Sequence, residues 1–316
     1  MNQQIENWLL EEDNPSVRYF TLRHLFDSPE DDPEVQAARH AIMTSEPVQK
    51  ILSAQAAEGY WVKPGKGYSP KYCATSWQLL FLAELGADGE NEQMRKGCEY
   101  FLGQSPTKHG GFDPLVYCLN GNMIWALTTL GFGSDERVAR AVDWLTGMIT
   151  GELPHTGSYS WPGFVCGPND KLPCAWGAVK ALRALTNLPP SMQSPRVKNA
   201  ATATVEFLFS HELAKADYPV YKRVSGEWFK FGFPLSYTSD VLEAAFVLCE
   251  ADHGGDPRLR NAVDLINSMR QADGRWLMKH SLNRKMWVDI EVKGKPSKWV
   301  TLRALHVLKV AGKEVR

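Results

Sequence analysis

The chain lacks an excess of charge of either sign. Its 316 residues include 35 Lys and Arg against 36 Asp and Glu, a formal net charge of -1. A chain balanced in this way has no overall electrostatic attraction for nucleic acid or for an anionic membrane surface. We therefore expect neither nucleic acid nor a membrane as a partner.

Long hydrophobic runs are also missing. No stretch approaches the ~18 consecutive apolar residues of a membrane-spanning helix, and the start MNQQIENWLLEEDNPS has neither the basic segment nor the apolar core of a secretory signal. These absences predict a cytoplasmic protein without a membrane span. The sequence also contains no phosphate-binding glycine loop, dinucleotide fingerprint, HExxH or GxSxG motif, so nothing in it favours a nucleotide-dependent enzyme or a hydrolase.

Cysteine is sparse but informative. Without an export signal, cysteines are better explained as thiols or metal ligands than as a disulfide framework. The sequence has six of them, at Cys73, Cys98, Cys118, Cys166, Cys174 and Cys249.

Two kinds of helix alternate along the chain. The first kind is amphipathic, as in Met94, Cys98 and Phe101, and buries one face. Several starts pair a polar residue with a proline, which suits a first helical turn. These starts are Asp32-Pro33, Glu46-Pro47, Ser194-Pro195 and Asp256-Pro257.

The second kind of helix is apolar almost all round and must therefore be buried on every side. It follows a loop that contains glycine and an aromatic residue. Five such helices are predicted, beginning near Thr75, Asn120, Ala175, Ser239 and Trp299. The loop aromatics Trp61, Phe112, Phe164, Trp228 and Trp276 lie 51, 52, 64 and 48 residues apart, which is typical of stacked repeats.

These patterns predict an all-α protein with one domain over residues 1–316. Residues 1–45 form an N-terminal helical hairpin, and residues 46–312 form five helix-pair repeats. Six pairs can close into an (α/α)6 toroid of inner and outer helices. An open superhelix would show the same local pattern.

Four segments resemble known repeat proteins. AQAAEGYW (residues 54–61) and RQADGRW (270–276) look like the glutamine-tryptophan motifs of squalene cyclases. HGGF (109–112) resembles a turn of protein prenyltransferase β subunits, and GFVCGPNDKLPCAW (163–176) is similar to their segment ending in a zinc-binding cysteine. The resemblance covers residues 45–312. It implies an α/α-toroid enzyme that processes an isoprenoid or terpenoid, terpene cyclase-like or prenyltransferase-like, with a hydrophobic small-molecule substrate and, in some relatives, a partner subunit.

The starts of the inner helices are the predicted site. In a ring these starts gather at one end, where helix dipoles present positive charge. Cys118, Cys174 and Asp240 lie there and are the predicted catalytic residues, because such a position lowers a cysteine pKa. The alternative is structural, since Asp240 is also placed to cap its helix and cysteines are commonly buried.

Zinc is the predicted cofactor. Cys174 matches the prenyltransferase ligand, but Leu172 stands where that family has aspartate, and SKWVTLRAL lacks the expected histidine. A replacement site would use Cys118, Cys166 and Cys174, because zinc accepts thiolate ligands in tetrahedral geometry. His155 and His211 are the candidates for a fourth ligand.

Acid-initiated cyclisation is the second chemical hypothesis. SDVLE (residues 239–243) looks like a shortened oxidosqualene cyclase motif, with Asp240 as proton donor. Such a donor needs burial to stay protonated near neutral pH. Aromatic side chains near the helix starts would line the substrate pocket or simply pack in the core. They are Trp77, Trp125, Trp176, Phe233, Tyr237 and Trp299.

A function from another class stays open at this point. Toroids host both enzymes and proteins that only present a surface. The alternative is therefore a non-catalytic lipid- or protein-binding toroid whose cysteines are structural.

Overall fold

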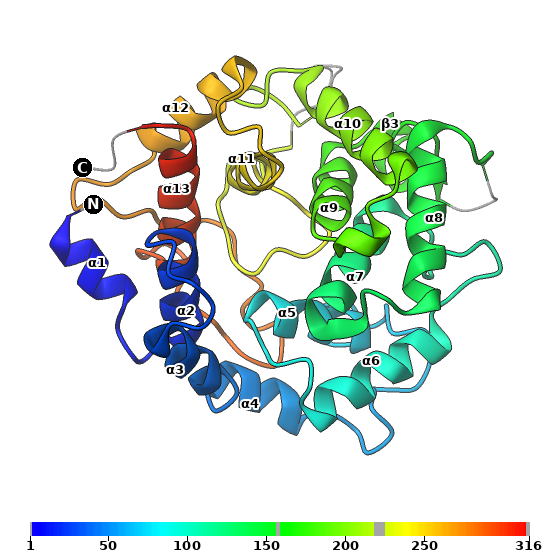
Figure 1. The fold of residues 1–316 in the computed structure, drawn as a ribbon, viewed down its shortest axis with the longest axis horizontal. Coiled ribbons are helices and arrows are strands. Elements are labelled where there is room, and N and C mark those ends of the chain that lie inside the picture. The colour runs from blue at the N-terminus through cyan, green and yellow to red at the C-terminus, as the bar shows by residue number, and fades with distance from the viewer. Residues whose placement is uncertain (1, 156–158, 218–224, 314–316) are drawn as a thin grey trace.

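The helices form two concentric layers around a common centre (Figure 1). The computed structural model describes residues 2–155, 159–217 and 225–313. The inner layer consists of α2 (Pro15–His24), α5 (Thr75–Glu84), α7 (Tyr117–Leu127), α9 (Ala175–Thr186), α11 (Val241–Glu250) and α13 (Lys298–Val310). The outer layer consists of α1 (Gln3–Leu9), α3 (Pro33–Ile42), α4 (Glu46–Ser53), α6 (Glu92–Gln104), α8 (Glu136–Thr150), α10 (Pro195–Phe209) and α12 (Arg260–Ser268). The all-α toroid is confirmed.

Short elements occupy the connections. A three-stranded antiparallel sheet joins β1 (Ser160–Trp161), β2 (Val165–Cys166) and β3 (Leu172–Pro173) in that order. Short helical turns also occur, with a π-helical turn at Thr128–Phe132 and 3-10 turns at Gly167–Asn169, Pro190–Met192 and Pro257–Leu259. They leave the helical character of the fold unchanged.

Burial explains the two layers. All ten residues of α5 are buried, whereas α6 buries one face that includes Met94, Cys98 and Phe101. Each fully buried large apolar side chain stabilises the fold by about 1.5–3 kcal/mol. The periodicity therefore identified the layer of α5 and of α6 correctly.

The predicted helix starts are close to those observed. Asp32 caps α3 by accepting from the backbone N–H of Glu34, and Ser194 caps α10 by accepting from that of Val197. The start at Asp256-Pro257 is a 3-10 turn that leads into α12. The second inner helix begins at Tyr117, three residues before Asn120, and Val116 is its N-cap residue.

Two of the five loop aromatics share one geometry. Trp61 and Trp276 each donate from Nε1 to a carbonyl ten residues earlier, in the outer helix, at 2.8 and 2.7 Å. Their backbone N–H groups donate to Thr75 and Thr301 of the following inner helix at 3.2 and 3.0 Å. Each of these two tryptophans thus connects an outer helix to the inner helix that follows it, as expected for equivalent positions in a structural repeat.

The first and last segments of the chain close the ring. α2 packs against α13, and Lys298 at the start of α13 forms ion pairs with Glu11 and Asp13 at 2.7 and 2.8 Å. On the other side, the ring of Phe20 in α2 reaches the turn at Gly86 after α5. The structure is therefore a closed toroid and not an open superhelix.

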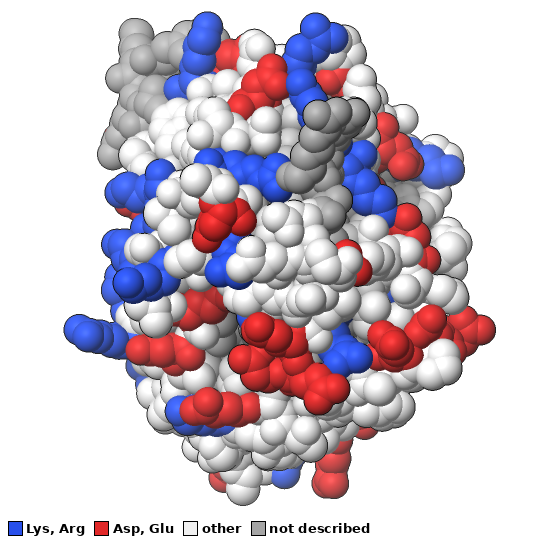
Figure 2. Space-filling view, turned by 90° about the vertical axis from the view of Figure 1, so that its left-hand side faces the viewer, with Lys and Arg blue, Asp and Glu red and all other residues white. Residues whose placement is uncertain are grey.

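Acidic and basic side chains are interspersed on the side of the molecule that carries both chain ends (Figure 2). This distribution matches the balanced composition of the chain. Within the described residues, no helix is long and apolar enough to cross a membrane.

Candidate functional site

The end of the ring where the inner helices begin, which we call the N-terminal mouth, is covered by aromatic side chains. Tyr237 precedes α11 and lies with its ring centroid 6.3 Å from that of Trp77 in α5 and 6.5 Å from that of Trp176 in α9. The hydroxyl groups of Tyr72 and Tyr237 are 3.4 Å apart. Three of the six predicted substrate-binding aromatics are thus brought together, but they pack across the mouth.

The predicted cysteines lie at this mouth with pKa values opposite to the expected ones. Cys118 is the second residue of α7, and Cys174 is the N-cap residue of α9. Burial raises the pKa of Cys118 to about 12 and raises the pKa of Cys174 further. The expectation of stable thiolates is therefore wrong, because the loss of hydration outweighs the helix dipole.

The three cysteines do not form a compact ligand set. Among the described residues, none of the groups of three or more donor atoms that lie within 4.8 Å of one another includes Cys118, Cys166 or Cys174. Of the candidate fourth ligands, His155 stacks on Trp161 with ring centroids 4.2 Å apart. His211 lies beside Phe207, and its two ring nitrogens are buried without a hydrogen-bond partner among the described residues. Zinc binding by these cysteines stays a prediction.

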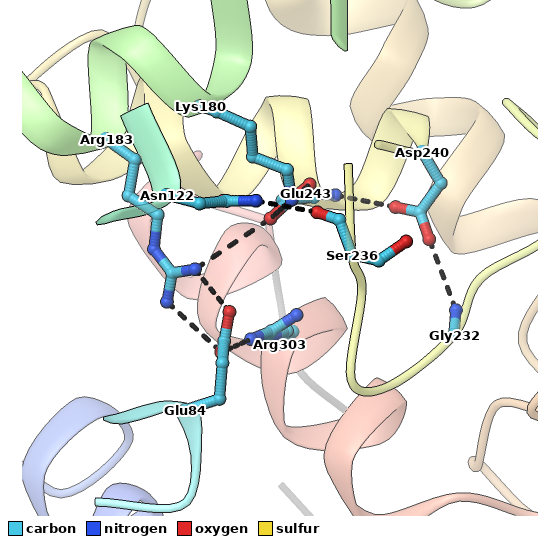
Figure 3. Close-up of polar contacts among 9 residues, drawn as sticks. All are labelled: Glu84, Asn122, Lys180, Arg183, Gly232, Ser236, Asp240, Glu243 and Arg303. Atoms are coloured by element: carbon cyan, nitrogen blue, oxygen red, sulfur yellow. Dashed lines mark hydrogen bonds and ion pairs between the residues drawn. The ribbon is translucent and has the colours of Figure 1, made fainter. Parts of the chain in front are cut away.

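Asp240 caps its helix and is deeply buried, and its catalytic role stays a prediction. One carboxylate oxygen accepts from the backbone N–H of Glu243 at 2.8 Å and caps α11, and the other accepts from the N–H of Gly232 at 3.2 Å (Figure 3). Burial raises the pKa of Asp240 to about 7. The side chain is only 2% exposed and is absent from the lining of the cavity described below.

A buried charge network, made of Lys180, Glu243, Arg183, Glu84 and Arg303, connects four inner helices (Figure 3). Lys180 Nζ lies 2.6 Å from Glu243 Oε1, and Arg183 Nη1 lies 3.9 Å from the same oxygen. Glu84 receives Arg183 on both oxygens and Arg303 Nη2 at 2.6 Å. Although burial alone would raise the pKa of Glu84, these two arginines hold it at about 2.

This network was not predicted from the sequence. The signal was present, because all five charged residues stand in helices that were predicted to be buried on every side. Lys, Glu and Arg are almost never fully buried unless they are paired. The periodicity could not say which of them would meet.

A cavity of about 240 Å³ opens at the opposite end of the ring, which we call the C-terminal mouth. It is lined by the last turns of α2, α5, α9 and α11, by Trp125 near the end of α7, and by α13 as far as His306. Trp125 and Trp299 are the two predicted aromatics that line it, and Phe233 stacks behind Trp299 with centroids 3.8 Å apart.

The lining of this cavity mixes aromatic and charged groups. The aromatic side chains are Phe20, Trp125, Phe246 and Trp299, and the ionisable ones are Glu84, Arg183, Arg303, Glu250, His24 and His306. Arg183 lies over the ring of Trp125, with its guanidinium carbon 3.4 Å from the centroid. The lining is therefore far more polar than the predicted isoprenoid pocket.

Two histidines and a carboxylate meet at the edge of the cavity. His306 Nε2 lies 2.7 Å from Glu250 Oε1, and the rings of His24 and His306 have centroids 5.0 Å apart. Burial, followed by the neighbouring His306, lowers the pKa of His24 to about 4. These histidines were not predicted as site residues.

Comparison with protein-family models finds no match, and comparison with curated proteins finds none either. Solved structures of similar architecture include an unsaturated glucuronyl hydrolase specific for heparin, with a TM-score of 0.49 and 12% identity over 95% of this chain and 85% of that one. A GH76 α-mannanase of Bacteroides thetaiotaomicron gives 0.45 and 11% over 95% and 85%. At these identities the likeness is one of helix arrangement.

The two layers of helices confirm the α/α-toroid part of the resemblance, but the predicted isoprenoid or terpenoid activity is wrong. The two enzymes of similar architecture are glycosidases, not prenyltransferases or squalene cyclases. The physical reason lies in the cavity, where a hydrocarbon chain would strip water from Glu84, Arg183, Arg303 and Glu250 without replacing its hydrogen bonds. The same lining speaks against the lipid-binding alternative.

Proposed function

We propose that the cavity at the C-terminal mouth binds a small polyhydroxylated ligand of the carbohydrate class. The observation that carries this proposal is the mixture of four aromatic rings with guanidinium, carboxylate and imidazole groups around one space. Aromatic faces provide apolar contact for the C–H face of a sugar ring, and ionised side chains make the stronger hydrogen bonds to hydroxyl groups. The volume, about 240 Å³, suits a small ligand.

The polar groups of the cavity are held in place before a ligand arrives. Glu84 is fixed between Arg183 and Arg303, and Arg183 is also fixed by its contact with Trp125. Rigid groups lower the entropy cost of binding. Because its pKa is held at about 2, Glu84 is a hydrogen-bond acceptor and not a proton donor, so the proposal is binding without an assigned bond-breaking step.

Calorimetry with neutral and acidic mono- and disaccharides tests this proposal. The titration is made at pH 7 in the presence of EDTA, and at least one saccharide is expected to bind with a millimolar or tighter Kd. Phe246→Leu is expected to weaken that binding by about 2–10-fold, the loss of one aromatic contact of about 0.5–1.5 kcal/mol.

Phe209→Leu is the matched control. Phe209 is also a partly buried ring, but it lies on α10 beside His253 and Arg258, away from the cavity. Its replacement should leave saccharide binding unchanged. Absence of binding by every saccharide, or equal weakening by the two variants, would contradict the proposal.

A further inference from the structure

His24, Glu250 and His306, which belong to the lining of the cavity, also form a compact set of metal-type ligands. They come from three inner helices, α2, α11 and α13, and their donor atoms all lie within 4.8 Å of one another. His24 comes from the first inner helix and His306 from the last, so the set exists only because the ring closes. Such a meeting of two imidazoles and a carboxylate requires a physical explanation.

The orientation of His306 is that of a metal ligand. Its Nδ1 lies 3.3 Å from the backbone carbonyl oxygen of His24, which can accept a hydrogen bond from Nδ1–H. In that tautomer the lone pair is on Nε2, which lies 2.7 Å from Glu250 Oε1, whereas in the other tautomer Nε2–H donates to this oxygen. A metal ion that replaced this proton would be bound by both atoms from the same side. Metal-bound histidines commonly donate their other ring N–H to a carbonyl.

We propose that His24, His306 and Glu250 together bind one divalent transition-metal ion at the edge of the cavity. Two imidazoles and one carboxylate are the donor set of zinc and iron(II) sites that keep open coordination positions. The open positions face the cavity, where a water molecule or a ligand hydroxyl group would complete the coordination. This site has no thiolate ligand and is separate from Cys118, Cys166 and Cys174.

The guanidinium groups near the set have carboxylate partners. Arg23 pairs with Glu30 at 3.1 Å, and Arg303 pairs at 2.6 Å with Glu84, which also receives Arg183. The side chain of Glu250 is 41% exposed, which gives an ion a path from solvent. The ring of Phe246 packs 5.1 Å from that of His306 and 5.8 Å from that of His24, and so restrains both imidazoles.

Cobalt(II) is the probe for this site, because its visible absorption reports the ligands directly. The full chain is stripped with chelator, dialysed and titrated with Co²⁺. One equivalent is expected to bind and to give visible absorption without the strong near-ultraviolet band of a cobalt–thiolate bond, and Zn²⁺ should displace it. Glu250→Gln and His24→Ala should each weaken Co²⁺ binding at least about tenfold.

Glu227→Gln is the matched control. Glu227 pairs with His280 at 2.9 Å, which gives a second His–Glu contact of similar length but without another histidine. Melting temperatures without metal show whether each variant is folded, and the partly exposed Glu250 makes Glu250→Gln the safer test. Less than a tenth of an equivalent bound, a thiolate band, or equal losses in Glu250→Gln and Glu227→Gln would overturn the proposal. Saccharide binding is measured in EDTA, so the two proposals fail independently.

Discussion

The two mouths of the ring are built by the same inner helices but have opposite surfaces. At the N-terminal mouth, Trp77 and Trp176 pack around Tyr237, and Cys174 at the start of α9 is buried. At the C-terminal mouth, aromatic rings and paired charges surround an open cavity. The difference shows that helix dipoles alone do not decide where a toroid places its cavity.

Loop length explains the difference. The connections that lead from an outer to an inner helix are long, as in residues 54–74 and 269–297, and they end at the N-terminal mouth. The connections that leave an inner helix are short, as in residues 85–91 and 187–194. Long loops supply the side chains that pack over the centre of one end of the ring, and the loops before α5 and α7 also line a second, more open pocket there. Short turns leave the cavity at the other end open.

The largest effect is expected from the charge network between the mouths. Lys180→Met leaves Glu243 buried without its closest cation, and breaking a buried pair in this way costs about 3–5 kcal/mol. Urea unfolding measures the loss. The double variant Lys180→Met/Glu243→Leu should recover much of the stability, because no unpaired charge remains. A loss of less than about 1 kcal/mol in the free energy of unfolding of the single variant would show that the network contributes little to the stability of the ring.

Thiol reactivity provides a smaller but more local test of the closed mouth. With its pKa raised from 9.0 to about 12, the thiolate fraction of Cys118 falls by roughly 10³-fold. We therefore expect Cys118 and Cys174 to react with a thiol reagent at pH 8 only when the protein unfolds. The partly exposed Cys73 should react first. Mass spectrometry of the labelled peptides gives the order, and rapid native labelling of Cys174 would show that this mouth is open.

Asp240→Ala is expected to lower stability less than Lys180→Met does, with an effect confined to the N-terminal mouth. At pH 5, Asp240→Ala removes a helix cap, which lowers the free energy of unfolding by about 1 kcal/mol. It also leaves the N–H of Gly232 without its acceptor, which lowers it by about 1–3 kcal/mol more. Urea unfolding checks this value. Unaltered Co²⁺ and saccharide binding by the folded variant would show that the effect stops at this mouth.

The pH dependence of the same residue has a definite sign. The folded pKa of Asp240 is raised from 3.8 to about 7, so the folded state binds the proton more tightly than the unfolded chain. Stability from this group is therefore lost as pH rises from about 4 to about 7. Asp240→Asn should gain stability relative to the wild type over that interval. A constant difference between the two proteins would show that Asp240 titrates normally.

Much of the fold was predictable because it depends on local periodicity. Apolar stripes identified the outer helices, continuous apolar segments identified the inner ones, and Trp61 and Trp276 marked equivalent loops. The candidate site was not predictable in this way. Its residues come from all six inner helices. The motif resemblance predicted a site at the starts of these helices, whereas most of the cavity is lined by their last turns.

The sequence by itself determined the alternation of helices, because hydrophobic burial follows a spacing of three to four residues along the chain. It also placed Asp240 at a helix cap, since capping is a local hydrogen bond. Only the tertiary structure decided which mouth is covered, which charges pair, and that His24 meets His306 from the other end of the chain. Those outcomes depend on ring closure and on side-chain contacts across the ring, which no local pattern encodes.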